Sequence, residues 1–123
     1  MKNLEDLEKF INSELTSKIN NSFIKHDNIY LNIDHDELID VISFLKTNKE
    51  TKFRQLIEIT AVDYPENEYR FKMVYFLLSH ENNQRINVEF NIKENDLADS
   101  ITNLFPSANW MEREVFDMYG ISF

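Results

Sequence analysis

Cysteine is absent from this sequence of 123 residues, glycine occurs once and proline twice. Without cysteine the chain can form no disulfide, thiolate zinc site or cysteine-ligated iron–sulfur cluster, and it has no cysteine nucleophile. A single glycine also excludes the glycine-rich phosphate loops of nucleotide-binding folds. The three histidines, His26, His35 and His80, are dispersed and lack the spacing of metal ligands. We therefore expect the chain to bind no flavin, haem, iron–sulfur cluster or metal.

Long hydrophobic runs are also missing. The longest, Met73 to Leu78, is far shorter than the roughly 20 residues of a membrane-spanning helix, and the first residues lack the apolar core of a signal peptide. Basic residues are few, because 13 Lys and Arg stand against 22 Asp and Glu for a net charge of -9. Phosphate backbones and anionic lipids would be repelled over most of such a surface. We expect a cytosolic chain that binds no nucleic acid.

Hydrophobic residues make up 42% of the sequence, which is enough for one core, so we interpret residues 1–123 as a single domain. A short strand, Ile29 to Ile33, and a helix over Glu37 to Lys46 are predicted, with Asp34 or Asp36 as the cap of the helix. Before them, apolar residues recur at steps of three and four and predict a first helix with one buried side: Leu4, Leu7, Phe10, Ile11, Leu15, Ile19 and Phe23.

Three longer strands are predicted from alternating apolar residues and turn-rich breaks: Phe53 to Asp63, Arg70 to Ser79 and Arg85 to Lys93. If Asn82 and Asn83 form a two-residue turn, the last hairpin pairs Tyr75 with Phe90 and Leu77 with Val88. One face of this hairpin is then wholly apolar and should pack on the helices. Its members are Phe71, Met73, Tyr75, Leu77, Ile86, Val88, Phe90 and Ile92.

The opposite face of that hairpin is mixed. It places three apolar side chains beside four polar ones, namely Val74, Phe76 and Leu78 beside Arg85, Asn87, Glu89 and Asn91. Such a surface is neither a core nor an ordinary solvent-exposed face. Either another segment of the same chain covers it, or it is a docking patch for another protein. The sequence leaves both interpretations open.

Two further helices are predicted after the strands. The first covers Glu94 to Leu104 and ends before Pro106, and the second begins at a capping Ser107 and ends at Gly120. Because Gly120 is the only glycine and follows the last helical residue, we expect it to have a positive φ. The predicted fold class is α+β, with two layers, in which helices pack on one face of a mainly antiparallel sheet of about four strands.

Ionisable residues are densest in the last helix, where Glu112, Arg113, Glu114 and Asp117 lie among large aromatic residues. Glu112 and Glu114 point about 200° apart on a helix, so they cannot converge on one substrate as acid and base. The cluster is either a solvated helix face or a docking site. In the docking interpretation, Glu114 and Asp117 are partly buried and paired with a cation: Arg113, Arg70 or Arg54. The residues alone favour an interaction module.

This last segment, Ala108 to Ile121, closely resembles the signature of the 30-kDa subunit of type I NADH:quinone oxidoreductase, which is respiratory complex I. Upstream segments resemble the same family in the right order, among them Phe53 to Leu56 and Ile59 to Pro65. In the family the chain continues into a tail rich in His-Pro and Arg that residues 1–123 do not include. The resemblance implies that the signature residues are docking residues: Trp110, Glu112, Arg113, Glu114, Asp117, Tyr119 and Gly120.

The resemblance also implies a role. The chain would be a non-redox, cofactor-free peripheral subunit of this proton-pumping translocase on the cytoplasmic side of the bacterial inner membrane, and it would be non-catalytic in isolation. Its partners would be the 49-kDa-type quinone-site subunit and an adjacent iron–sulfur subunit, which with other subunits carry FMN, iron–sulfur clusters and quinone. The alternative is a subunit of a membrane-bound nickel–iron hydrogenase or a related oxidoreductase. A remote alternative is a free-standing carboxylate-dependent hydrolase that uses Glu112, Glu114 or Asp117.

Overall fold

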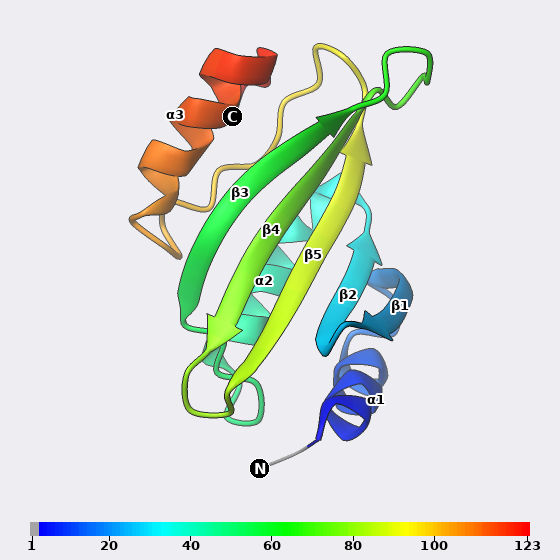
Figure 1. Ribbon diagram of the computed structural model, residues 1–123, viewed down its shortest axis with the longest axis vertical. Coiled ribbons are helices and arrows are strands. Elements are labelled where there is room, and N and C mark those ends of the chain that lie inside the picture. The colour runs from blue at the N-terminus through cyan, green and yellow to red at the C-terminus, as the bar shows by residue number, and fades with distance from the viewer. Residues whose placement is uncertain (1–2) are drawn as a thin grey trace.

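A computed structural model describes residues 3–123 as helices and strands in the order drawn in Figure 1. The elements are α1 (Leu4–Glu14), β1 (Ile19–Lys25), β2 (Asn28–Ile33), the 3-10 turn η1 (His35–Glu37), α2 (Leu38–Thr47), β3 (Gln55–Asp63), β4 (Phe71–Ser79), β5 (Gln84–Ile92) and α3 (Ala108–Tyr119). The strands form one five-stranded sheet in the order β1-β2-β5-β4-β3. The pair β2 and β5 is parallel and the other neighbours are antiparallel, which confirms the α+β class with a mainly antiparallel sheet.

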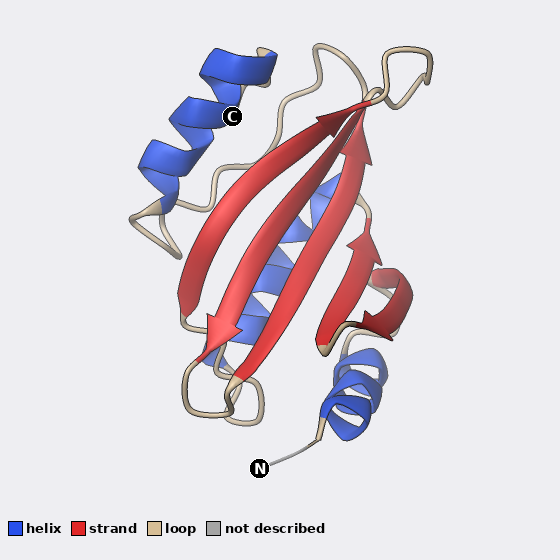
Figure 2. Ribbon diagram, in the orientation of Figure 1, coloured by secondary structure: helices blue, strands red, loops and turns tan. Residues whose placement is uncertain are grey.

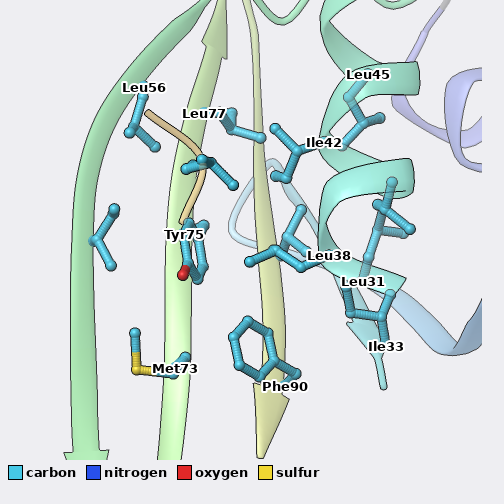
Figure 3. Packing of buried hydrophobic residues seen from close by; sticks show 14 of the residues in the cluster. Leu31, Ile33, Leu38, Ile42, Leu45, Leu56, Met73, Tyr75, Leu77 and Phe90 are labelled. Carbon is cyan, nitrogen blue, oxygen red and sulfur yellow. The ribbon is translucent and has the colours of Figure 1, made fainter. Parts of the chain in front are cut away.

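The core lies between the sheet and α2, which Figure 2 shows behind the long strands. Leu38, Ile42 and Leu45 of α2 are fully buried, and Figure 3 shows them beside side chains from the sheet such as Tyr75 and Phe90. Each fully buried side chain of this kind contributes roughly 1.5 to 3 kcal/mol. All eight residues of the predicted apolar face, from Phe71 to Ile92, are buried, so that prediction is confirmed.

The pairing of β4 with β5 differs from the predicted register. Ser79 pairs with Gln84 and Tyr75 with Val88, because the connection is a four-residue loop, residues 80–83, where two residues were expected. The shift amounts to two positions on the partner strand. Since side chains alternate between faces with a period of two, a shift of two leaves every residue on its predicted face. The face was therefore right although the register was wrong.

The first predicted helix is correct only as far as Glu14. Asn3 caps α1 by accepting a hydrogen bond from the Asp6 N–H at 2.8 Å, and the chain then turns and enters β1 at Ile19. β1 and β2 form a hairpin, in which the rings of Phe23 and Tyr30 stack with 4.8 Å between their centroids. This strand pairing overrides the helical spacing that Ile19 and Phe23 continue by coincidence.

The helix predicted over Glu94 to Leu104 is also wrong. These residues form turns and extended backbone, and the Ala98 N–H donates to the Ser122 carbonyl at 2.9 Å. Leu97, expected on the buried side of a helix, is 69% exposed. The side-chain cap expected before α2 is missing too, since neither η1 nor α2 has one and Asp34 instead accepts from the side chain of Asn20 at 2.9 Å.

Within residues 3–123 no helix covers the mixed face of the sheet, although Val74, Asn87 and Glu89 on this face are buried. Figure 2 views the sheet from this side. Phe76 is only partly buried there, and Val62 of β3 is 41% exposed. Of the two interpretations, coverage by a helix of the same chain is thus not observed for the described residues.

Candidate functional site

The candidate site is α3, because it holds six of the seven signature residues and the seventh, Gly120, ends it. Its start differs from the prediction, since Ser107 has helical backbone angles and its side chain makes no cap hydrogen bond. The chain enters the helix through a turn in which the Ala108 N–H donates to the Phe105 carbonyl at 2.9 Å. Its end is as predicted, because Gly120 has a φ of 73° and donates its N–H to the Phe116 carbonyl at 2.8 Å.

One side of α3 faces the protein. Ala108, Glu112 and Val115 are buried on this inner side, and Tyr119 packs edge-on against the ring of Phe71 with 6.3 Å between centroids. Their spacing of four, three and four residues is that of one helical stripe. The stripe fixes the helix beside β3, the strand that α3 contacts (Figure 1).

Glu112 is the one charged member of the inner side, and it is 6% exposed. One carboxylate oxygen accepts a hydrogen bond from the Ser100 hydroxyl at 2.7 Å, and the other accepts from the Ile101 N–H at 2.8 Å. Both donors lie in the irregular segment before α3, so Glu112 ties that segment to the helix. Hydrogen bonds to a charged group are roughly twice as strong as neutral ones, which makes this contact a structural clamp.

The hydroxyl of Tyr75 lies in the core near this clamp. Tyr75 is fully buried, and its Oη has no hydrogen-bond partner in the part of the chain that the structure describes. Burial raises the pKa of this phenol far above its usual range, and the negative charges of Glu112 and Asp99 raise the pKa further. The hydroxyl therefore stays protonated, and it adds an unsatisfied polar atom to an otherwise apolar core.

The opposite, outer side of α3 carries the remaining charges. Arg113, Glu114 and Asp117 are exposed, and among residues 3–123 none of the three forms an ion pair. The expectation that Glu114 and Asp117 are partly buried and paired is therefore wrong. The two strand-side cations proposed for them are engaged elsewhere, Arg70 with Asp63 and Glu94, and Arg54 with Glu81.

Large apolar side chains accompany these charges. Trp110 is 70% exposed, Met118 68% and Phe116 50%. We call the six residues together the outer surface of α3: Trp110, Arg113, Glu114, Phe116, Asp117 and Met118. Exposed aromatic residues and methionine beside an arginine are typical of protein interfaces. The sequence had named most of these residues and had placed Glu112 and Glu114 on different sides of the helix, but it did not identify which of the two lies inside. The spacing Ala108, Glu112, Val115 was the signal that places Glu112 inside.

Neither a metal site nor a membrane-spanning helix is found among the described residues. Within residues 3–123 no group of three or more His, Asp or Glu side chains is arranged to hold one. None of the helices formed by these residues combines the length and the apolar character needed to cross a bilayer.

Comparisons with known proteins match the chain to one family. The family model described as the 30 Kd subunit of respiratory-chain NADH dehydrogenase matches residues 31–123. A protein of Chelativorans sp. named as the C subunit of NADH-quinone oxidoreductase is 37% identical over 120 residues, which are 98% of this chain and 60% of that protein. Proteins of the same name from Ruegeria pomeroyi and Dinoroseobacter shibae are 50% identical over 95 residues and 42% over 120. They are covered over 48% and 56% of their length, and this chain over 76% and 98%. The chain thus spans about half to three fifths of these relatives.

A solved structure shares the fold. It is that of the membrane-bound sulfane sulfur reductase, an archaeal respiratory membrane complex, and the match has a TM-score of 0.84. It covers 97% of this chain and 69% of that chain at 24% sequence identity. At this identity the likeness concerns the fold alone.

Proposed function

Because the chain belongs to the family of the 30-kDa subunit of respiratory-chain NADH dehydrogenase, we propose that it is a non-redox docking subunit of an NADH:quinone oxidoreductase. Its role is to hold neighbouring subunits in place while they transfer electrons from NADH to quinone. The chain itself carries no cofactor; FMN, the iron–sulfur clusters and the quinone belong to its partners. The absence of cysteine supports this division, since thiolates are the usual ligands of iron–sulfur clusters.

The outer surface of α3 is the observation that carries the proposal. It exposes an indole, a phenyl ring and a thioether beside charges that no other described residue neutralises. Interface hot spots are rich in Trp and Arg and lie in patches that become dehydrated on binding. We assign this surface to the 49-kDa-type quinone-site subunit, with an adjacent iron–sulfur subunit as the second neighbour.

The location follows from the same proposal. The subunit lies on the cytoplasmic side of the bacterial inner membrane and contacts the membrane only through the complex. The net charge of -9 supports this indirect attachment, because an acidic protein is repelled by anionic lipid head groups.

A different parent complex is the main alternative. The same fold occurs in a membrane-bound sulfane sulfur reductase, so the fold by itself also fits other membrane-bound respiratory complexes. Sequence identity of 37% to 50% with proteins named as a subunit of NADH-quinone oxidoreductase favours the quinone-reducing complex. The remote alternative, a free-standing hydrolase, is disfavoured by Glu112, whose two oxygens already accept hydrogen bonds inside the protein. Turnover by the isolated chain that Glu114→Gln abolishes would revive it.

Affinity purification of the tagged subunit from its host tests the proposal. We expect the quinone-site and iron–sulfur subunits to co-purify with the wild-type chain. Trp110→Ala should weaken the association by about 30-fold, as expected for a hot-spot residue worth about 2 kcal/mol. Ile39→Ala is the matched control, because Ile39 is an exposed apolar residue of α2. Failure of the wild-type chain to retain these subunits, or equal retention by both variants, would contradict the docking role.

A further inference from the structure

A groove of about 240 Å³ separates α3 from β3. Figure 1 shows the two elements side by side, with β3 at the edge of the sheet. Both contribute a carboxylate to its lining, Glu58 from β3 and Glu114 from α3. Met111 and Met118 of the helix and Ile59 of the strand also line it. The groove thus combines apolar walls with two acidic groups that lie 56 positions apart in the sequence.

Local structure explains why both carboxylates line the groove. The pairing of β3 with β4 shifts between Leu56 and Glu58, and Glu58 then pairs with Phe76 of the mixed face. On α3, Met111, Glu114 and Met118 are spaced by three and four residues and so share one side of the helix. Glu114 and Met118 therefore lie at the border of the outer surface that adjoins β3, whereas Arg113 does not line the groove.

The two carboxylates lack a cation. Glu58 and Glu114 are exposed, and neither forms an ion pair with any of residues 3–123. Other carboxylates of the same sheet are paired, for example Glu89 with Lys72 at 3.2 Å. Two like charges in one groove repel each other, and removing water from them would be costly without an opposite charge. A partner that covers this groove must therefore bring the cation.

We propose that the groove receives a basic side chain, lysine or arginine, of the partner polypeptide. The methylene stem packs on Met111 and Met118, and the charged head reaches Glu58 and Glu114. Lysine and arginine lay their stems along apolar surface in this way, and methionine adapts its shape to such contacts. A second copy of the chain is a poor occupant, because two chains of charge -9 repel each other. The inference rests on the proposed docking function and names the chemistry of the contact.

The test uses the assembled complex with the double variant Glu58→Gln and Glu114→Gln, which removes the charges and preserves the size of both side chains. Its matched control is Glu14→Gln with Glu66→Gln, since both residues are exposed and have no ion pair among residues 3–123. The groove variant should lower the affinity of the subunit for its partners by about tenfold or more. The remaining affinity should depend less on salt, because a charged contact has been lost. The control should behave as the wild-type chain does.

A labelling experiment measures whether the groove is covered in the assembled complex. Because the chain has no cysteine, Met118→Cys introduces a single thiol at the groove wall. We expect a maleimide to label this thiol readily in the free chain and slowly in the assembled complex. Equal labelling in both states would show that the groove stays open and would overturn the inference.

The outcomes separate the two proposals. If the wild-type chain joins no complex, the docking function and the groove contact both fail. If the wild-type chain assembles and the double variant equals its control, only the groove contact is overturned. Titration of the free chain with Mg²⁺ alone adds a third outcome: tight binding that the double variant abolishes would make the groove a metal site and overturn the basic occupant.

Discussion

Glu112 and Glu114 are chemically identical and two residues apart, yet they lie in opposite environments on the two sides of α3. Glu112 is buried, and each of its oxygens accepts a hydrogen bond from the segment before the helix. Glu114 is exposed, and among residues 3–123 no cation pairs with it. The inner side is therefore paired within this chain, and the outer side is left to water in the free chain and to the partner in the proposed complex.

This difference predicts which property of the protein each side of α3 determines. When a buried carboxylate with satisfied oxygens is removed, its hydrogen-bond donors are left without an acceptor, which lowers the stability of the fold. An exposed charge is already solvated by water, so its removal changes the stability of the free chain little. The inner side should thus govern the stability of the folded chain, and the outer side should govern assembly.

Glu112→Ala should produce the largest effect on the free chain, a loss of about 3 kcal/mol in the free energy of unfolding. The substitution leaves the Ile101 N–H buried without its acceptor and removes a hydrogen bond to a charged group. Urea denaturation measures the change. Glu114→Ala is the control and should cost less than about 0.5 kcal/mol. If the two variants lost equal free energy of unfolding, the proposed difference between the two sides of the helix would be wrong.

Gly120→Ala should rank second, at about 1 kcal/mol, because alanine resists the left-handed conformation that Gly120 adopts at a φ of 73°. A Cβ built on Gly120 would have no neighbouring atom within 4 Å, so the cost is conformational and not steric. Gly120→Asn should be milder, since asparagine tolerates this conformation better. A thermal melt of the three proteins compares them. If asparagine cost as much as alanine, the assignment of the cost to backbone conformation would be wrong.

Tyr75→Phe should change stability in the opposite direction and raise the free energy of unfolding by about 1 kcal/mol. The Tyr75 hydroxyl is buried without a partner among the described residues, so its removal ends a desolvation penalty. Tyr30→Phe is a suitable control, because Tyr30 is only partly buried. A marked loss of stability in the Tyr75 variant would reveal a hydrogen bond that residues 3–123 do not supply.

The ion pair between Asp63 and Arg70 should make the stability of the folded chain depend on pH. The Arg70 guanidinium hydrogen-bonds both oxygens of Asp63 and lowers the pKa of that carboxyl below its ordinary value of 3.8. A depressed pKa stabilises the folded chain above about pH 4, and this contribution is lost as the pH falls. Asp63→Asn should therefore narrow the difference in stability between neutral and acid pH. Chemical denaturation of the wild-type chain and of the variant at neutral and acid pH measures this difference.

The sequence predicted the fold well where local pattern and tertiary packing agree. The apolar face from Phe71 to Ile92 and the helix around Leu38 to Leu45 were predictable because period and burial coincide there. The first helix was extended too far because Ile19 and Phe23 continue its spacing, although pairing with β2 makes them a strand. Such pairing is not encoded in local periodicity.

The site was predictable in part for a related reason. The signature named Glu112, Arg113, Glu114 and Asp117, and helical geometry placed Glu112 and Glu114 on different sides. The partners of Glu112 were hidden, because Ser100 and Ile101 belong to a segment whose helical pattern predicted the wrong structure. Its backbone N–H groups are used by residues distant in sequence, which no spacing rule reveals.

Arg113→Ala should have the smallest effect on the free chain and a large one on the complex. In the sequence-based interpretation Arg113 was the partner of buried carboxylates, and its loss would have cost several kcal/mol. The Arg113 side chain is instead exposed and has no ion pair within residues 3–123, so the loss on unfolding should stay below about 0.5 kcal/mol. Assembly should nevertheless fall, because Arg is a frequent anchor of interfaces. Measuring urea unfolding of the variant beside its incorporation into the complex tests both halves. Normal assembly with lost quinone reductase activity would assign Arg113 to the chemistry and reject the docking role.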